Sequence, residues 1–239
     1  MSNKVVQGLW IGSALSVMEQ LSIRSFLMNG HEFHLYVYDD VKYIPAGTVV
    51  KDAAEILPAA RIFQYKDHQT YSGFANFFRY KLLLERGGWW MDVDIVCLKP
   101  LDFADEYVFA AEIAGESTVV NNGAIKAPVG SDAMSLAWRA CDETDPAKMV
   151  WGQTGPKLLT QVVSELSLAR YVSPPETFNP LESRHWRKVL DASTDLELSD
   201  QTYAIHLWRE MWRRTGTAKD TTYDPDCLYE QLKARYHLS

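Results

Sequence analysis

The sequence predicts an α/β fold in which a mixed, mainly parallel sheet is flanked by helices. Short apolar runs with strand character alternate with longer segments in which apolar residues recur at helical spacing. The first part of the chain contains a strand–helix–strand pattern, the unit from which parallel sheets are built. A length of 239 residues suits a single domain, 1–239, which we divide into halves at 1–100 and 101–239.

The opening elements follow from apolar runs and their stop signals. A strand is expected at 5–11, and Ser13 is expected to cap a helix at 13–28, before the Asn29-Gly30 stop. The next strand is expected at 33–38, and a short helix at 51–57. This strand–helix–strand unit is a usual beginning of a nucleotide-binding sheet.

A helix at 72–86 has the clearest pattern in the chain. Phe74, Phe77, Phe78 and Leu82 fall at helical spacing and form one buried stripe. Gly87-Gly88 ends this helix, and one continuous strand is expected at 89–98. The later elements are expected as strands at 107–111, 124–127 and 203–208, helices at 132–141, 154–165 and 225–237, and a loop at 173–184.

Charge and composition exclude several classes of protein. A net charge of −7 argues against nucleic-acid binding, which needs a basic surface. No apolar run approaches the roughly 20 residues that span a bilayer, and the N-terminus lacks a signal-peptide pattern. The three cysteines are too few and too far apart for a disulfide framework or a zinc site. We therefore expect a cytoplasmic protein without a nucleic-acid partner, and the sequence leaves its oligomeric state open.

Two carboxylates, Asp92 and Asp94, carry the first hypothesis about chemistry. In a continuous strand they would point to one side, about 7 Å apart, and repel by roughly 2 kcal/mol. A divalent cation would offset this repulsion, because hard cations prefer oxygen ligands. The alternative is a strand end whose acids are merely solvated. Asn76 and Arg79 share a helix face before this pair, and Arg79 can bind a phosphate or sugar hydroxyls, or instead form a surface ion pair.

The block at 75–94 resembles the sugar-binding region of family 32 glycosyltransferases, and also the catalytic domain of the large clostridial glucosylating toxins. It combines the amphipathic helix, the Gly87-Gly88 stop and the Asp92-Val93-Asp94 triplet in that order. Shorter segments at 9–12, 121–125, 154–156 and 206–208 follow the family pattern in sequence. The family often has Asp where this chain has Asn76, so the resemblance does not specify the donor sugar.

The resemblance implies a GT-A-type domain, a nucleotide-sugar donor, a divalent metal and retention of anomeric configuration. It implies that 1–100 bind the nucleotide and that 101–239 bind the acceptor and close the site. Asp92, Asp94 and His206 are the implied metal ligands, and a nitrogen ligand beside carboxylates favours Mn²⁺, with Mg²⁺ as the alternative. The implied donor-binding residues are Trp10, Ile11, Asn76, Arg79, Tyr80, Asp92, Val93, Asp94, Asn122 and Trp208.

The expected reaction moves a hexose from a UDP-sugar, such as UDP-galactose or UDP-glucose, to a hydroxyl of a glycan. Trp10 would stack on the base, Asn76 and Arg79 would orient the sugar, and the metal would stabilise the leaving diphosphate. No clear nucleophile is visible in the sequence. Glu112 and Gln153 are candidates near the anomeric carbon, by position alone. We favour same-face attack over a covalent intermediate.

The acceptor is expected to be a glycan or a lipid-linked glycan, used in bacterial surface polysaccharide synthesis. The basic, aromatic stretch at 208–214, which contains Trp208 and Trp212, could then contact a membrane, or be a solvated face. Two other functions stay open. A haloacid-dehalogenase-type phosphohydrolase also uses an Asp-x-Asp triplet after an apolar strand, and a non-catalytic sugar-binding protein could keep the same fold.

Overall fold

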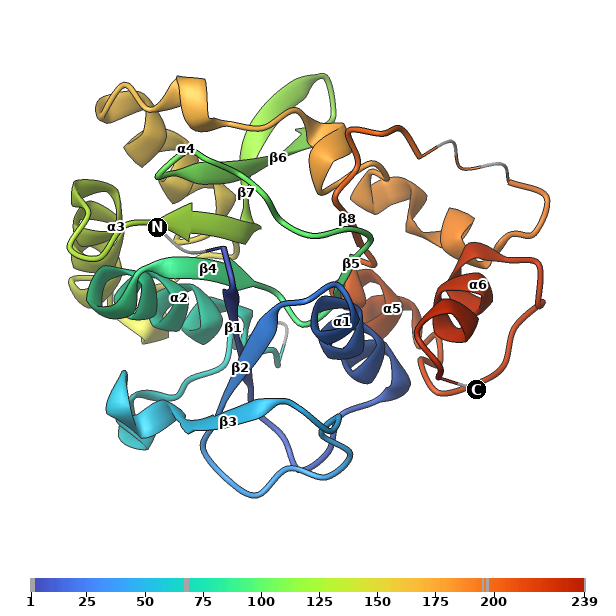
Figure 1. Ribbon diagram of the computed structural model, residues 1–239. Coiled ribbons are helices and arrows are strands. Elements are labelled where there is room, and N and C mark those ends of the chain that lie inside the picture. The colour runs from blue at the N-terminus through green and yellow to red at the C-terminus, as the bar shows by residue number, and fades with distance from the viewer. Residues whose placement is uncertain (1–2, 67–68, 195, 197, 239) are drawn as a thin grey trace.

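A six-stranded sheet forms the centre of the computed structural model, which describes residues 3–66, 69–194, 196 and 198–238 (Figure 1). The strand order is β3-β2-β1-β4-β7-β6. Neighbouring strands are parallel from β3 to β4, whereas β7 runs antiparallel to both β4 and β6. The predicted mixed, mainly parallel sheet flanked by helices is therefore confirmed. The strands are β1 (Val5–Trp10), β2 (Glu32–Val37), β3 (Val49–Asp52), β4 (Gly88–Met91), β6 (Val108–Ala114) and β7 (Ser117–Ala127).

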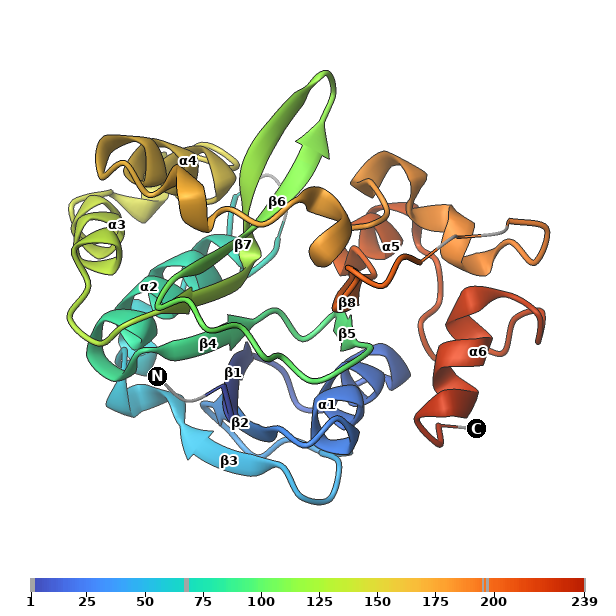
Figure 2. The same cartoon turned by 45° about the horizontal axis from the view of Figure 1, so that its top comes forward.

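Helices cover both faces of this sheet. Side chains alternate between the faces along each strand, so each strand contributes residues to the cores on both sides. Trp89 and Met91 of β4 join the core that contains α1 (Val17–Met28). Trp90 points the other way and joins the core under α2 (Ser72–Arg86). On that face α2 is accompanied by α3 (Asp132–Asp142) and α4 (Pro156–Glu165), as Figures 1 and 2 show. The predicted phenylalanine stripe of α2 is confirmed, since all four of its side chains are buried in this core.

The C-terminal part of the chain packs against α1 on the side away from α2. β5 (Ile95–Cys97) and β8 (Ala204–His206) form a separate antiparallel pair. α5 (Arg209–Thr215), α6 (Leu228–Arg235) and the 3₁₀ helix Ser183–Leu190 gather around a third core. Met18 and Leu21 of α1 enter this core beside the fully buried Trp212. Ile95, which follows the turn after β4, pairs with His206. This pairing brings β8 close to the end of β4.

The continuous strand predicted at 89–98 is wrong, because the chain turns between β4 and β5. The amide of Asp92 bonds to the carbonyl of Gly123 on β7 at 2.8 Å, and the amide of Ile95 then bonds back to Asp92 at 3.0 Å. Val93 and Asp94 form the turn between these contacts. Aspartate favours turns because its side chain competes for backbone hydrogen bonds. The two carboxylates therefore do not lie on one face of one strand.

Four further expectations about elements differ from the structure. Ser16, rather than Ser13, caps α1, and its capping box with Glu19 fixes the helix start. Residues 51–57 contain the end of β3 and a single 3₁₀ turn, Ala53–Glu55, instead of a helix. The hairpin strand β7 begins at Ser117, well before residue 124. The expected loop at 173–184 contains the short 3₁₀ helix Pro175–Thr177. Within the described part of the chain, no helix has the length and apolarity needed to cross a membrane.

Candidate active site

A cavity of about 420 Å³ opens where β1 and β4 end. It lies between residues of the sheet and α2 and residues of the segment 206–214. Its lining includes most of the residues predicted for the site. These are Trp10, Ile11, Asn76, Arg79, Asp92, Val93, Asp94, Glu112, Asn122, His206 and Trp208. Residues from both halves of the chain thus meet in one cavity.

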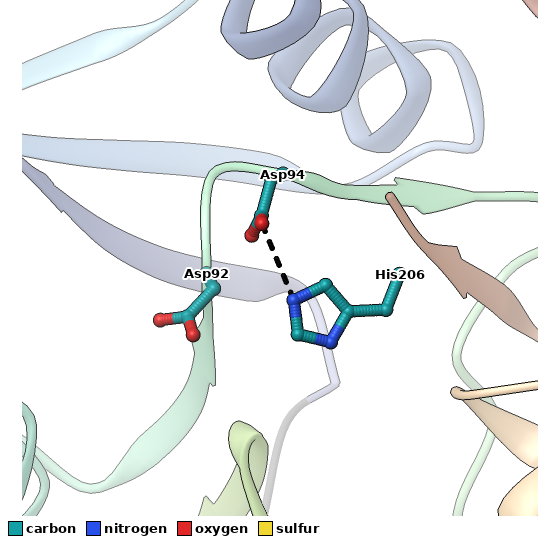
Figure 3. A group of neighbouring side chains, drawn as sticks. All are labelled: Asp92, Asp94 and His206. Atoms are coloured by element: carbon teal, nitrogen blue, oxygen red, sulfur yellow. Dashed lines mark ion pairs between the residues drawn. The ribbon is translucent and has the colours of Figure 1, made fainter. Parts of the chain in front are cut away.

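Asp92, Asp94 and His206 converge in this cavity (Figure 3). One ligand atom from each lies within 4.8 Å of the others. Nε2 of His206 is 3.3 Å from Oδ2 of Asp94, and the picture shows the two side chains pointing toward each other. The turn between β4 and β5 makes this possible, because it aims Asp94 at β8.

The backbone around Trp208 holds this arrangement in place. Trp208 adopts the left-handed conformation, with φ +57°, which is uncommon for a bulky residue and recurs at functional sites. This bend lets the amide of Arg209 donate to Oδ2 of Asp94 at 2.8 Å. The amide of Leu207 donates to the Asp94 carbonyl at 2.9 Å. The Trp208 ring stacks on His206, with centroids 3.9 Å apart.

Asn179 sets the orientation of the His206 ring. Its Nδ2 donates to the carbonyl of Ala111 at 2.8 Å, so its Oδ1 is the atom that faces Nδ1 of His206, at 3.0 Å. Nδ1 must therefore carry the proton that it donates to Oδ1. In the neutral ring, the lone pair of Nε2 then faces the Asp94 carboxylate. A proton or a cation between the two groups relieves the resulting repulsion.

The cavity shifts the pKa values of Asp92, Asp94 and His206 in different ways. Burial alone would raise the pKa of Asp94, but the charge and hydrogen bond of His206, with the Arg209 amide, lower it to about 2. Burial raises the pKa of Asp92 above its usual value, although Arg79 opposes the effect. Burial acts to lower the pKa of His206, but the Asp94 carboxylate outweighs it and the pKa is raised. Asp94 is therefore an anion over the whole physiological pH range.

The three side chains fit a divalent cation. Two carboxylates and one imidazole form a ligand set that suits Mn²⁺ or a related ion. Ligand atoms bound at about 2.1 Å to one six-coordinate ion lie about 3 Å apart, close to the 3.3 Å between Asp94 and His206. Asp94 and His206 would hold such an ion, with Asp92 as the third ligand.

Arg79 ties α2 to the floor of the cavity. Its Nη1 lies 3.1 Å from Oδ1 of Asp92 and also donates to the carbonyl of Asn122, while Nε donates to the Ala75 carbonyl at 3.2 Å. The guanidinium lies over the Trp90 ring, 4.8 Å from its centroid. Trp90 in turn donates from Nε1 to Asp92 at 2.9 Å. Arg79 is buried, so these contacts fix it as part of the site and exclude a surface ion pair.

Two amides and a hydroxyl form a second network beside Arg79. Nδ2 of Asn122 donates to Oδ1 of Asn76 at 2.8 Å, and Nδ2 of Asn76 donates to Oγ1 of Thr154 at 3.3 Å. Tyr80 lies behind this network and outside the cavity lining, and its hydroxyl donates to the Thr154 carbonyl at 3.0 Å. Tyr80 therefore supports the wall and is not placed to contact a ligand directly.

Trp10 lines the cavity on the side of β1. Its ring is contacted by the guanidinium of Arg209, 4.8 Å from the centroid, and by Lys219 at 5.8 Å. Both cations also pair with the fully buried carboxylate of Glu19. The buried Nε1 of Trp10 has no hydrogen-bond partner among the described residues.

The structure distinguishes the two candidates that were chosen by position alone, Glu112 and Gln153. Glu112 on β6 faces the cavity, and burial raises the pKa of its carboxyl group. Gln153 does not line this cavity, because it is exposed and its Oε1 accepts a hydrogen bond from the Val150 amide at 3.1 Å. The structure therefore does not bring Gln153 to the site.

The stretch at 208–214 does not present its tryptophans at the surface. Trp208 is 8% exposed and Trp212 is fully buried, while Arg213 and Arg214 pair with Glu210. The two rings therefore do not form an exposed aromatic surface on this stretch.

Several lining residues have no clear signal in the sequence. Arg209, Trp151 and Tyr65 line the cavity, and Asn179 supports it from behind. The composition hinted only that some aromatic rings would bind a sugar or a base. Arg209 comes beside Asp94 through the pairing of β5 with β8, which no local pattern in the sequence indicates.

Comparison with known proteins identifies the family. Residues 16–114 match the model described as "Glycosyltransferase sugar-binding region containing DXD motif", and residues 147–236 match "Alpha 1,4-glycosyltransferase conserved region". Lactosylceramide 4-alpha-galactosyltransferase of Pongo pygmaeus is 31% identical over 174 residues, covering 66% of this chain and 75% of that protein. The Homo sapiens protein of the same name is also 31% identical, but the match covers 46% of its length, so this chain spans less than half of it.

Among solved structures, the one titled PaToxG Glycosyltransferase is 15% identical, covers 98% of this chain and 85% of its own, and has a TM-score of 0.48. The two family models cover the central block at 75–94 and the later segments at 154–156 and 206–208. The match to the lactosylceramide 4-alpha-galactosyltransferase of Pongo pygmaeus supports the same assignment. The chain therefore belongs to the glycosyltransferases of the family 32 type, which carry the DXD sugar-binding region.

Proposed function

We propose that this glycosyltransferase is metal-dependent and moves a hexose from a UDP-sugar to a hydroxyl of a glycan, with retention of anomeric configuration. The observation that carries the proposal is the convergence of Asp92, Asp94 and His206 beside the network of Arg79, Asn76 and Asn122 in one cavity. UDP-galactose is the first donor to test, because relatives that match this chain are named galactosyltransferases.

In the proposed reaction, the bond between the anomeric carbon and the diphosphate oxygen breaks. A bond from the same carbon to the acceptor oxygen forms, and the acceptor proton passes to the departing diphosphate oxygen. When bound, the cation supplies positive charge that stabilises the leaving diphosphate. Asp94 and His206 would hold that charge, and the Trp208 stack and Asn179 keep the imidazole from rotating.

The residues around the donor would divide the remaining work. Trp10 offers a ring and an unpaired Nε1–H for the base, and Arg209 adds a cation beside it. The amides of Asn76 and Asn122 offer hydrogen bonds to sugar hydroxyls. Arg79 positions Asp92 and the Asn122 carbonyl, because its Nη1 pairs with the Asp92 carboxylate and donates to that carbonyl.

The two retaining routes, a covalent intermediate and same-face attack, differ in the role of Glu112. It is a cavity carboxylate that could act as a nucleophile, whereas Asp92 is engaged by Arg79 and Trp90. We favour same-face attack, in which Glu112 stabilises positive charge at the anomeric carbon without forming a bond. A Glu112→Gln variant that keeps measurable transfer with retention supports this route, and trapping of a glycosylated Glu112 peptide by mass spectrometry contradicts it.

The decisive experiment is a donor screen. The purified protein is incubated with Mn²⁺ and each of a panel of nucleotide sugars, and nucleoside diphosphate release is measured without acceptor. We expect slow hydrolysis of one UDP-hexose, its loss on chelation by EDTA, and at least a hundredfold decrease in Asp94→Ala. A folded protein that neither binds nor hydrolyses any donor would instead support the non-catalytic sugar-binding alternative, and release of phosphate from simple phosphomonoesters the phosphohydrolase.

The biological setting is also a proposal. The three cysteines are free and buried, as suits a reducing compartment such as the cytoplasm. We propose bacterial surface polysaccharide synthesis as the process, on the resemblance of the central block to family 32 enzymes.

A further inference from the structure

We propose that Tyr65, Trp151 and Arg214 form a carbohydrate subsite at the wall of the cavity, which binds the ring of the acceptor sugar. This inference rests on the proposed transfer function and assigns the acceptor side of the same cavity. All three residues line the cavity that contains Asp92 and His206. None of them is among the residues assigned to the donor. The proposal therefore assigns this part of the cavity wall to the acceptor.

An aromatic pair forms the base of the subsite. The rings of Tyr65 and Trp151 lie with centroids 4.9 Å apart and an interplanar angle of 47°. Tyr65 is buried, whereas Trp151 is 38% exposed. A large indole exposed at the wall of a polar cavity suits the apolar face of a sugar ring, which places C–H groups on the aromatic face and hydroxyls at the edge.

An unsatisfied hydroxyl points to a polar ligand at the same place. The Tyr65 hydroxyl is buried, and burial raises its pKa, while the Thr154 side chain and the Gly152 backbone lie close enough to lower it; no described residue forms a hydrogen bond of full geometry with it. A buried hydroxyl left in this state is unfavourable unless something else satisfies it. The wall is open at Gly152, where an added methyl group would meet no described atom within 4 Å. In the proposed complex, a hydroxyl of the sugar bound on Trp151 supplies the partner of the Tyr65 hydroxyl.

Arg214 closes the subsite from α5. Its guanidinium lies 5.0 Å from the centroid of the Trp151 ring and donates from Nε to Glu210 at 2.8 Å. A cation–π contact at a partly exposed site is weak. A sugar ring can therefore replace the guanidinium on the indole, and Arg214 can then donate to the oxygens of the sugar while it stays paired with Glu210.

Neighbouring residues provide matched controls. Arg213 also pairs with Glu210 but does not line the cavity. Val150 precedes Trp151, is 69% exposed and does not line the cavity either. Substitution of Val150 changes the same loop, and substitution of Arg213 removes the other cation paired with Glu210, while the three side chains of the subsite stay in place.

The test separates acceptor binding from donor chemistry. Two rates are measured with the UDP-hexose found in the donor screen: hydrolysis without acceptor, and transfer to a panel of 4-nitrophenyl glycosides of galactose, glucose, N-acetylglucosamine and lactose. We expect transfer to at least one glycoside. For that glycoside, Trp151→Ala should raise KM by about tenfold or more, and Tyr65→Phe by about fivefold. Hydrolysis should stay within about twofold of the unsubstituted protein in both variants, and Val150→Ala and Arg213→Ala should leave both rates unchanged.

Other outcomes are equally decisive. An unchanged acceptor KM in Trp151→Ala overturns the subsite, and so does a loss of donor hydrolysis in that variant, which would place the ring on the donor. Hydrolysis by the unsubstituted protein with no transfer to any glycoside of the panel also overturns it. Absence of both hydrolysis and transfer contradicts the proposed function itself.

Discussion

Oδ1 of Asn179 accepts the hydrogen bond of Nδ1 of His206 at 3.0 Å and thereby directs Nε2 toward Asp94. A partner behind a metal-binding histidine commonly raises metal affinity 10- to 100-fold. We expect Asn179→Ala to weaken Mn²⁺ binding by about tenfold, measured by calorimetry or by electron paramagnetic resonance of free Mn²⁺. Asn179→Asp keeps an acceptor for Nδ1 and should retain most of the affinity. Unchanged affinity in a folded Asn179→Ala protein would show that the ring needs no such partner.

Arg79 should contribute strongly to stability. Arg79→Met leaves the Asp92 carboxylate and the Asn122 carbonyl without their buried cation, so we expect a loss of about 3 kcal/mol in the free energy of unfolding, measured in urea. Arg86→Met is the control, because Arg86 is exposed and lies 3.8 Å from Glu55, a pair that should contribute less than about 1 kcal/mol. Equal losses in the two variants would contradict the role given to Arg79.

Gly123 lies against the carboxylate of Asp92. A methyl group at this position would lie 2.9 Å from Oδ1 of Asn121 and 3.2 Å from Oδ2 of Asp92, so one of the side chains must move. We expect Gly123→Ala to keep the fold, by circular dichroism, and to lower the turnover rate about 10- to 100-fold. Gly155→Ala should have a smaller effect, because its nearest contact would be 3.4 Å. A fully active Gly123→Ala protein would show that Asp92 tolerates displacement.

Glu112 should make stability depend on pH. Burial raises the pKa of this carboxyl group in the folded protein, so the folded state binds its proton more tightly than the unfolded state does. The folded protein therefore loses stability as pH rises from the unfolded pKa through the raised folded pKa, and the loss is complete above it. We expect Glu112→Gln to have a higher Tm than the unsubstituted protein at pH 8, and the difference to shrink toward pH 4. A Tm difference that does not change with pH would contradict this assignment.

The thiols should be unreactive in the folded protein. Burial raises the pKa of Cys97 to about 12 and raises that of Cys141 as well, so both remain protonated at pH 8. Neither side chain is accessible to solvent, and neither is that of Cys227. We expect less than one equivalent of thiol to react with a disulfide reagent within minutes at pH 8, and all three after unfolding in guanidinium. Rapid reaction of the native protein would indicate local opening of these cores.

Much of the central block was predictable, because its determinants are local. The phenylalanine spacing of α2 and the glycine stop after it depend on neighbouring residues, and both were predicted correctly. The strand that follows was extended too far, because an apolar run continues through Ile95 and Val96 across the turn. Only the turn, closed by the hydrogen bond from the Ile95 amide to the Asp92 carbonyl, shows that β4 has already ended.

The sequence alone determined the α/β class, the helix that carries Asn76 and Arg79, and the Asp92–Asp94 pair, because periodicity and stop signals are written in consecutive residues. The tertiary structure decided which distant residues complete the site. Pairing of β5 with β8 brings His206 to Asp94, Asn179 then fixes its ring, and the cavity admits Glu112 but not Gln153. Asp94 and His206 are about 110 positions apart and Asn179 lies 27 positions from His206, so these contacts arise from strand register and core packing, which no local pattern encodes.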